Sequence, residues 1–328
     1  MLLTTSATPR ECTFCRRGTT ERSAHLKIER VAVECISPTS PPSEAPAPES
    51  SWRLWLWPNF LSLDAPLVAV LWQVLLTRDL GVHVRAGEPL VLGLCVWLVY
   101  VADRVFDALR PLNGEWEPAR KTFYRRHLWV ASMAALSLLS VIIPLAYCVL
   151  RRSTFYAGLA LTVPVISYFA LIHLRPVGWR ARWPRELVVA CLFTSGTFLA
   201  IWTGNPGSVY SLWAPALLFF LLCWTNCAAI ETWEWRQKIL SQDSAPSRST
   251  RWVARHLTFA GLGIGCLAAI LGVASLAPGG FSGAALSSGI ALALVAAWRR
   301  RLPMNALRVS VDLALCTPLL ALIFPVGR

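Results

Sequence analysis

Long apolar runs separated by short polar segments fill the sequence from residue 58 to residue 326. A helix that crosses a bilayer needs about 20 mostly apolar residues, with a range of about 17–25. Nine runs meet this requirement, and we expect each to be a membrane-spanning helix. They are 58–77, 89–109, 128–150, 153–174, 186–203, 209–230, 257–277, 281–298 and 308–326. The pattern therefore predicts an all-α fold, a polytopic bundle of nine transmembrane helices.

The first part of the chain follows a different pattern. Residues 1–52 contain no long apolar run, mix Arg and Lys with Glu, and end in a segment rich in Ser and Pro. Such a segment has too little apolar surface to bury, so we expect a disordered N-terminal tail before a transmembrane domain at 53–328. Cys12 and Cys15 could form half of a zinc site, but no second pair lies nearby, which favours a tail without metal.

Composition supports a membrane protein and argues against a soluble one. Hydrophobic residues make up 55% of the chain and charged residues 15%, whereas a typical soluble domain carries roughly 25% charged residues. The net charge of +13 raises the question of nucleic acid. Its Lys and Arg residues, however, cluster in short segments between the apolar runs, which is the pattern of membrane topology. We therefore expect membrane lipid, and no nucleic acid, around this chain; no protein partner can be inferred.

The distribution of basic residues between the predicted spans sets the orientation. The connections after the second, fourth, sixth and eighth spans carry nineteen Lys and Arg residues, against four in the other connections. Cytoplasmic loops carry the excess of Lys and Arg in multi-pass proteins. We expect an integral protein of a bacterial inner membrane, with its N-terminus and the four basic connections in the cytoplasm.

Acidic residues lie near the ends of five predicted spans. Ionisable groups at membrane depth are costly, so they are candidates for function first. By the orientation above, all seven lie at cytoplasmic ends, which suggests one water-accessible pocket that also includes Asn226. They are Asp64, Asp103, Asp107, Glu186, Glu231, Glu234 and Asp312. The alternative is that each is a solvated helix end that pairs with a nearby Arg.

Two of these acidic pairs have the spacing of one helix face. Asp103 and Asp107 are at positions i and i+4, and Glu231 and Glu234 are at i and i+3. Paired carboxylate oxygens suit Mg²⁺, which keeps several waters and is usually completed by substrate phosphates. We expect these four residues to hold Mg²⁺ and to be the catalytic acids.

The chain also contains a short internal repeat. Arg126-His127-Leu128 opens the third predicted span, and Arg255-His256-Leu257 opens the seventh. A shift of four spans preserves orientation, so the repeat would be parallel and would place the two acidic pairs face to face. The two histidines start helices in basic loops, and an interfacial position is favoured over a metal role.

Nine spans with acidic motifs at the cytoplasmic ends of the second and sixth resemble the UbiA superfamily of intramembrane prenyltransferases. The resemblance covers about 58–326. Asp103 and Asp107 match the aspartates of the family's first motif, where Val99 replaces its Asn. Glu231 and Glu234 stand in the second motif as glutamates, one residue closer together. In the family's first-span element, Asp64 and its following proline are kept, without the neighbouring Arg and Lys.

The resemblance implies transfer of an isoprenyl group from an isoprenyl diphosphate to an aromatic or other lipophilic acceptor, with Mg²⁺ as cofactor. It also implies that basic residues beside the acidic motifs bind the diphosphate, and that the prenyl tail lies in an apolar groove between helices. The candidate residues are Arg110, Arg120, Lys121, Arg125 and Lys238. Two alternatives stay open: a non-catalytic UbiA-like membrane protein, and a transporter, in which charges would more often lie at mid-membrane.

Overall fold

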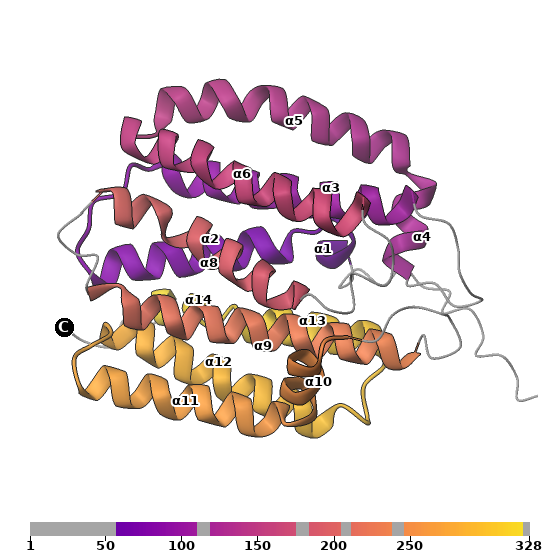
Figure 1. Cartoon of the computed structure of the whole chain (residues 1–328). Coiled ribbons are helices and arrows are strands. Elements are labelled where there is room, and N and C mark those ends of the chain that lie inside the picture. The colour runs from indigo at the N-terminus through magenta and orange to yellow at the C-terminus, as the bar shows by residue number, and fades with distance from the viewer. Residues whose placement is uncertain (1–56, 110–118, 175–183, 205–210, 238–245, 324–328) are drawn as a thin grey trace, which may run out of the picture. The chain divides into compact units, whose positions relative to one another are not determined.

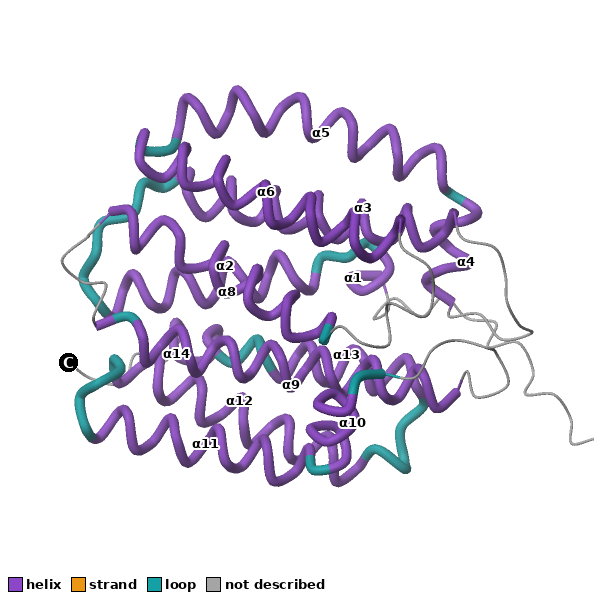
Figure 2. Tube along the Cα trace, in the orientation of Figure 1, coloured by secondary structure: helices purple, strands orange, loops and turns teal. Residues whose placement is uncertain are grey.

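The computed structural model describes residues 57–109, 119–174, 184–204, 211–237 and 246–323, all of which belong to the unit Ser51–Arg328. Within these ranges the chain is helical, with no strand, and short loops join the helices (Figure 2). The predicted tail 1–52, with Cys12 and Cys15, lies outside the described residues. The helices are α1 (Trp57–Phe60), α2 (Asp64–Asp79), α3 (Gly87–Leu109), α4 (Ala119–Arg126), α5 (Leu128–Val149), α6 (Arg152–Leu174), α8 (Arg185–Gly204), α9 (Trp213–Gln237), α10 (Arg248–Arg255), α11 (Leu257–Val273), α12 (Gly279–Trp298), α13 (Met304–Ala314) and α14 (Pro318–Ile323).

Six of the described helices are long and apolar enough to cross a membrane: α3, α5, α6, α8, α9 and α12. A seventh span is formed if α10 and α11, which meet at a bend of 82°, are counted together. The chain is therefore an all-helical protein with several helices that can span a membrane. The predicted number of nine is not reached, because α2 has only 16 residues and the last predicted span is divided between α13 and α14.

The division between α13 and α14 has a clear cause in the sequence and its contacts. Pro318 has no N–H to donate to the preceding turn, so the helix cannot continue through it. A backbone carbonyl at the break is satisfied from another helix, because Trp72 Nε1 donates to the carbonyl of Leu315 at 2.8 Å. The Thr317 hydroxyl also ties the break to α12, since it donates to the carbonyl of Ala284 at 2.8 Å. A break inside a bilayer is tolerated when neighbouring helices satisfy the freed groups in this way.

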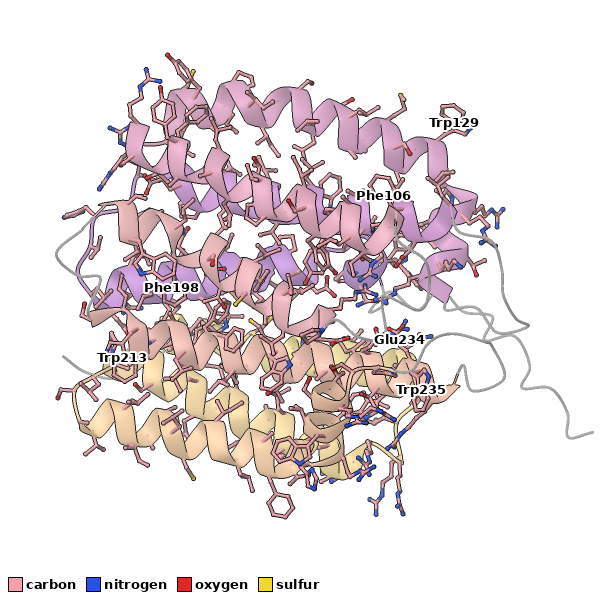
Figure 3. The ribbon with its side chains drawn as sticks, viewed as in Figure 1. Phe106, Trp129, Phe198, Trp213, Glu234 and Trp235 are labelled. Atoms are coloured by element: carbon pink, nitrogen blue, oxygen red, sulfur yellow. The ribbon has the colours of Figure 1, made fainter. Side chains whose placement is uncertain are left out.

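Figure 1 shows α2 and α8 lying between two groups of helices, α3, α5 and α6 on one side and α9 with α11–α14 on the other. The core is built around Trp72, whose ring lies 4.8 Å from that of Phe281 and 5.2 Å from that of Phe219. By contrast, in α5 and in α6 only 6% of the most apolar stretch of the helix is buried inside the protein. Trp129 on α5 points outward in Figure 3 and is 80% exposed. Their apolar surfaces are available to lipid.

The helices α11 and α12 approach each other closely. Gly261 and Gly289 face each other across this contact, and a Cβ atom on Gly261 would lie 2.6 Å from the carbonyl oxygen of Gly289. Small residues allow helix backbones to approach in this way in membranes, where packing rather than the hydrophobic effect holds helices together.

Successive long helices alternate in direction, so the C-terminal ends of α3, α6, α9 and α12 lie on one side, together with α4 and α10 (Figure 1). This is the side of the basic connections, and we call it the basic side. The opposite side carries the α2–α3 and α5–α6 turns.

Candidate functional site

A polar cavity of about 170 Å³ lies near the basic side, between α2, α3, α6, α8, α9 and α13. We call it the polar cavity. Six of the seven acids singled out in the sequence line it together with Asn226. They are Asp64, Asp103, Glu186, Glu231, Glu234 and Asp312. Residues far apart in the sequence are thus brought to one space by the ends of antiparallel helices.

The other predicted site residues that the structure describes do not line the polar cavity. Asp107 is one turn beyond Asp103 on α3 and is absent from the cavity lining, as are Lys121 and Arg125. Arg125 Nε instead donates to the carbonyl of Ala108 at 3.4 Å. Of the five predicted diphosphate ligands, Arg120 alone lines the polar cavity among those that the structure describes. Arg110 and Lys238 lie outside the described residues.

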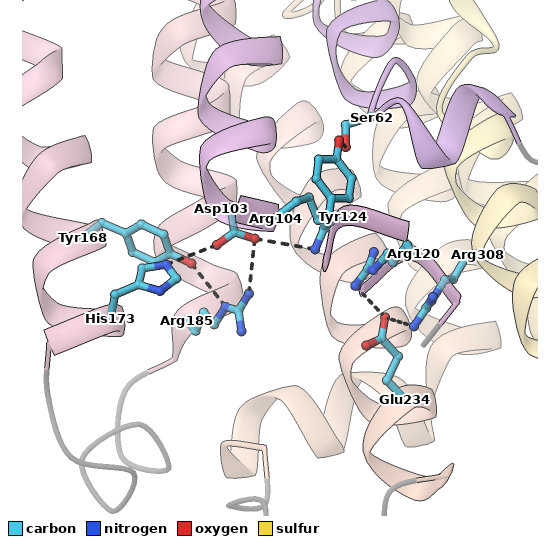
Figure 4. A network of polar contacts seen from close by, with 10 residues as sticks. All are labelled: Ser62, Asp103, Arg104, Arg120, Tyr124, Tyr168, His173, Arg185, Glu234 and Arg308. Carbon is cyan, nitrogen blue, oxygen red and sulfur yellow. Dashed lines mark hydrogen bonds and ion pairs between the residues drawn. The ribbon is translucent and has the colours of Figure 1, made fainter. Parts of the chain in front are cut away.

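Asp103 is surrounded by basic side chains from three helices (Figure 4). Its Oδ2 atom lies 3.5 Å from Arg104 Nη1 and 3.9 Å from Arg185 Nη2, and its Oδ1 atom lies 3.6 Å from His173 Nε2. Arg185 Nε also donates to the hydroxyl of Tyr168 at 3.2 Å, which fixes the guanidinium at the cavity wall. One carboxylate is thus shared by two guanidinium groups.

Glu234 is the centre of a second ion-pair group. Its Oε1 atom lies 3.0 Å from Arg120 Nη2 and 2.5 Å from Arg308 Nη2, so residues of α4, α9 and α13 meet at one oxygen (Figure 4). Burial, reinforced by the neighbouring charge of Arg104, lowers the pKa of Arg120 to about 10. That value is still well above neutral pH, so Arg120 stays charged and faces the cavity.

Two other carboxylates of the cavity are held by amides rather than by arginines. Asn59 Nδ2 donates to Asp64 Oδ2 at 2.9 Å, and Asn226 Nδ2 donates to Asp312 Oδ1 at 3.0 Å. We call Arg104, Arg120 and Arg185 the basic wall of the polar cavity, and Asp64 and Asp312 its acidic wall. An anionic group would bind at the first and a proton or cation at the second.

Three basic residues of this site were absent from the predicted set. Arg104, Arg185 and Arg308 entered the sequence analysis only as topology signals, yet Arg104 and Arg185 line the polar cavity and Arg308 pairs with Glu234. A signal was present in the sequence, because each lies within one turn of a carboxylate inside or at the end of an apolar run. Basic residues at such positions belong to the same costly class as the acids.

A second cavity, of about 240 Å³, lies beside the polar cavity, between α2, α3, α6 and α8. We call it the apolar cavity, because aliphatic side chains form most of its wall. The two cavities share five lining residues: Val99, Tyr100, Tyr168, Val189 and Phe193. The apolar cavity reaches Glu88 near the start of α3. At 1.5 Å per residue, Glu88 lies roughly 22 Å along α3 from Asp103.

The donor chemistry of the polar cavity suits Mg²⁺ that is completed by phosphate oxygens. No group of three or more metal-ligating side chains occurs in the described ranges. Mg²⁺ bound with a phosphorylated substrate needs only one or two carboxylates from the protein. Asp103 and Glu231, from two different helices, both line the cavity. Two carboxylates in a cavity that also holds Arg104 and Arg185 suit a cation that arrives together with its anion.

Comparison with protein-family models, with curated proteins and with solved structures finds no match to this chain.

Proposed function

We propose that the chain is an intramembrane prenyltransferase that moves an isoprenyl group from an isoprenyl diphosphate to a lipophilic, aromatic or other acceptor. The observation that carries this proposal is that the two cavities adjoin, with five lining residues in common. A polar cavity with a basic wall beside an apolar cavity matches a ligand with a diphosphate head and a hydrocarbon tail.

The head group would bind at the basic wall. Arg104, Arg120 and Arg185 present planar guanidinium groups to the cavity, and such groups bind phosphate oxygens in pairs. Asp103 and Glu234 hold these arginines in place through the ion pairs described above. Because the site is shielded from bulk water by the helices, each charge interaction is stronger there than at a solvated surface.

Mg²⁺ would be held by Asp103 and Glu231 with diphosphate oxygens, and when bound it neutralises the charge of the leaving group. In the transfer, the allylic C–O bond breaks and its electron pair leaves with the diphosphate, which the three arginines retain. The acceptor forms the new bond and releases one proton. Asp64 and Asp312, on the acidic wall, are the residues placed to receive it.

The tail would lie in the apolar cavity. Tyr100, Tyr168 and Phe193 stand where the two cavities join, so their rings border the carbon next to the diphosphate. Aromatic faces stabilise an adjacent cation, which suits the allylic charge that develops as the C–O bond breaks.

The membrane arrangement belongs to the same proposal. We infer that α2 with α1, α11, and α14 with α13 also cross the bilayer, which gives a UbiA-like bundle of nine spans. The basic side then faces the cytoplasm of a bacterial inner membrane, because Lys and Arg concentrate there. The polar cavity opens toward the side on which a soluble diphosphate is supplied.

A second function is favoured by one observation. Asp103 and Glu234 each form ion pairs with arginines. A non-catalytic protein that only binds an isoprenyl diphosphate, without Mg²⁺, would have this arrangement.

Turnover separates the two functions. Purified full-length protein in lipid nanodiscs is incubated with labelled isoprenyl diphosphates of several lengths, Mg²⁺ and a panel of aromatic acceptors. The proposal predicts labelled prenyl product together with released diphosphate, and loss of both in Asp103→Asn. Saturable binding with no product and no released diphosphate across the panel would favour the non-catalytic function.

A further inference from the structure

The short helix α10 differs from every long helix in its direction and its surface. It meets α11 at a bend of 82°, at His256, so it runs across the end of a spanning helix rather than along it. Figure 1 shows it beside the C-terminal half of α9 on the basic side. A helix placed in this way lies at the level of the lipid headgroups if α11 crosses the bilayer.

The two faces of α10 have opposite chemistry. Thr250, Val253 and Ala254 are buried against the bundle. The opposite face is exposed and has the i, i+3, i+4, i+7 spacing of one helical stripe. It consists of Arg248, Arg251, Trp252 and Arg255.

Nothing in the described part of the chain neutralises this stripe. Its three arginines form no ion pair within the described ranges, and α10 contains no acidic residue. Trp252 is 63% exposed, and Phe259, on the first turn of α11 beyond the bend, is 75% exposed. Exposed aromatic residues that flank the start of a spanning helix are typical of the membrane–water interface.

The related helix α4 differs from α10 in where its first arginine points. Both helices end at a histidine whose Nδ1 atom lies 3.0 Å from the carbonyl oxygen four residues earlier, Phe123 in one and Trp252 in the other. In α4, however, Arg120 points inward to Glu234. In α10 the residue that corresponds to Arg120 is Ser249, and the buried residue beside it is Thr250, whose hydroxyl donates to Glu186 at 2.6 Å. All three arginines of α10 are exposed.

We propose that the Arg248–Arg251–Trp252–Arg255 stripe of α10 is a binding site for the headgroup of an anionic phospholipid. Guanidinium groups bind the lipid phosphate, and juxtamembrane basic clusters attract anionic lipids. The indole of Trp252 lies at the headgroup level, and Phe259 contacts the acyl chains below it. A zwitterionic lipid has the same phosphate, but the cationic amine of its headgroup cancels the phosphate charge. The site therefore prefers an anionic lipid.

The proposal has a structural consequence for the polar cavity. Thr250, on the buried face of α10, donates its hydrogen bond to Glu186, which lines the polar cavity. A lipid that holds α10 in place therefore also holds one wall of that cavity. This contact does not depend on which ligand the cavity takes.

Native mass spectrometry of the full chain in detergent, titrated with phosphatidylglycerol or phosphatidylcholine, tests the site. We expect wild type to retain phosphatidylglycerol preferentially, and the triple variant R248Q/R251Q/R255Q to lower its apparent affinity at least tenfold without changing that for phosphatidylcholine. The matched control is R299Q/R300Q/R301Q, which removes the same number of charges from the same side at the end of α12 and should change the affinity less than twofold.

Two results would overturn the proposal: unchanged phosphatidylglycerol binding in the α10 triple variant, or an equal loss in both triple variants, which would show diffuse attraction only. If the α10 triple variant does not fold, Arg251→Gln and Arg300→Gln are compared singly, and a loss confined to Arg251→Gln supports the site. Equal effects of the two single variants count against it.

Discussion

Glu234 Oε1 on α9 lies 2.5 Å from Arg308 Nη2 on α13, and the two side chains are only 8% and 3% exposed. Glu234 follows the sixth predicted span and Arg308 opens the ninth, so the two residues are far apart in the sequence. This pair therefore joins the second acidic motif to the last part of the bundle. Arg120 reaches the same oxygen from α4. Glu234 is therefore an organiser of the basic wall, in addition to any role with a metal.

Removal of one member of this buried pair should destabilise the bundle. Glu234→Gln leaves Arg308 buried without its counter-charge, which costs about 3 kcal/mol or more. Glu234→Gln/Arg308→Gln should lose less than the two single variants added together, because neither charge is then left alone. Thermal unfolding in detergent measures all four proteins, and strict additivity would show that the two residues do not interact.

The contact between α11 and α12 makes a second stability prediction. Gly261→Leu places side-chain atoms where the backbone of Gly289 lies, so it should force the helices apart and cost about 1–3 kcal/mol. Gly263→Leu is the matched control on the same helix, since no atom lies within 4 Å of a Cβ at that position. Equal melting temperatures for the two variants would contradict the close packing of α11 on α12.

The apolar cavity can be filled without any change to the polar cavity. Gly196 lines the apolar cavity, and its nearest neighbour there, Leu161 Cδ2, would lie 3.8 Å from an added Cβ. Gly196→Leu should therefore weaken binding of a long-chain isoprenyl diphosphate at least tenfold, about 1.4 kcal/mol, while inorganic diphosphate binds as before. Isothermal titration with both ligands checks this. Equal losses for the two ligands would mean that the cavity does not hold the tail.

Orientation has its own test. Cysteines introduced one at a time at Arg300 and Arg152, in a chain whose native cysteines are replaced by serine, lie on opposite sides of the bundle. A membrane-impermeant reagent added from outside the cell should label the cysteine at 152 and leave that at 300 unlabelled, because basic residues concentrate on the cytoplasmic side. The reverse pattern would overturn the proposed orientation.

Most of the helix bounds follow from the sequence. The run predicted at 128–150 is the helix Leu128–Val149, and the run at 281–298 is Gly279–Trp298. Apolar composition decides such helices locally. Pro318 marks a position where the last predicted span could break, but the contact that stabilises the break comes from Trp72, a residue of another helix, and could not be predicted.

The site was also predictable only in part, because some of its features are local in the sequence and others depend on how the helices pack. Position along a helix places Asp103 and Glu234 at one depth, and the structure brings both to the polar cavity. Which helix faces turn inward depends on packing, so Asp107 and Lys121 lie away from the cavity while Arg185 lines it. The five residues shared with the apolar cavity come from three helices and have no common motif.

Binding of a labelled isoprenyl diphosphate to the full chain in nanodiscs, with Mg²⁺ or with EDTA, tests the central claim most directly. Asp103 both pairs with arginines and, in this account, shares Mg²⁺ with the diphosphate. Wild type should bind saturably and more tightly with Mg²⁺. Asp103→Asn should lose at least tenfold in affinity with Mg²⁺ but not with EDTA, where the arginines alone hold the diphosphate. Arg185→Gln should lose affinity in both conditions, and Arg152→Gln, on the opposite side, in neither. No saturable binding by wild type, or equal behaviour of Asp103→Asn and Arg152→Gln with Mg²⁺, would contradict the account.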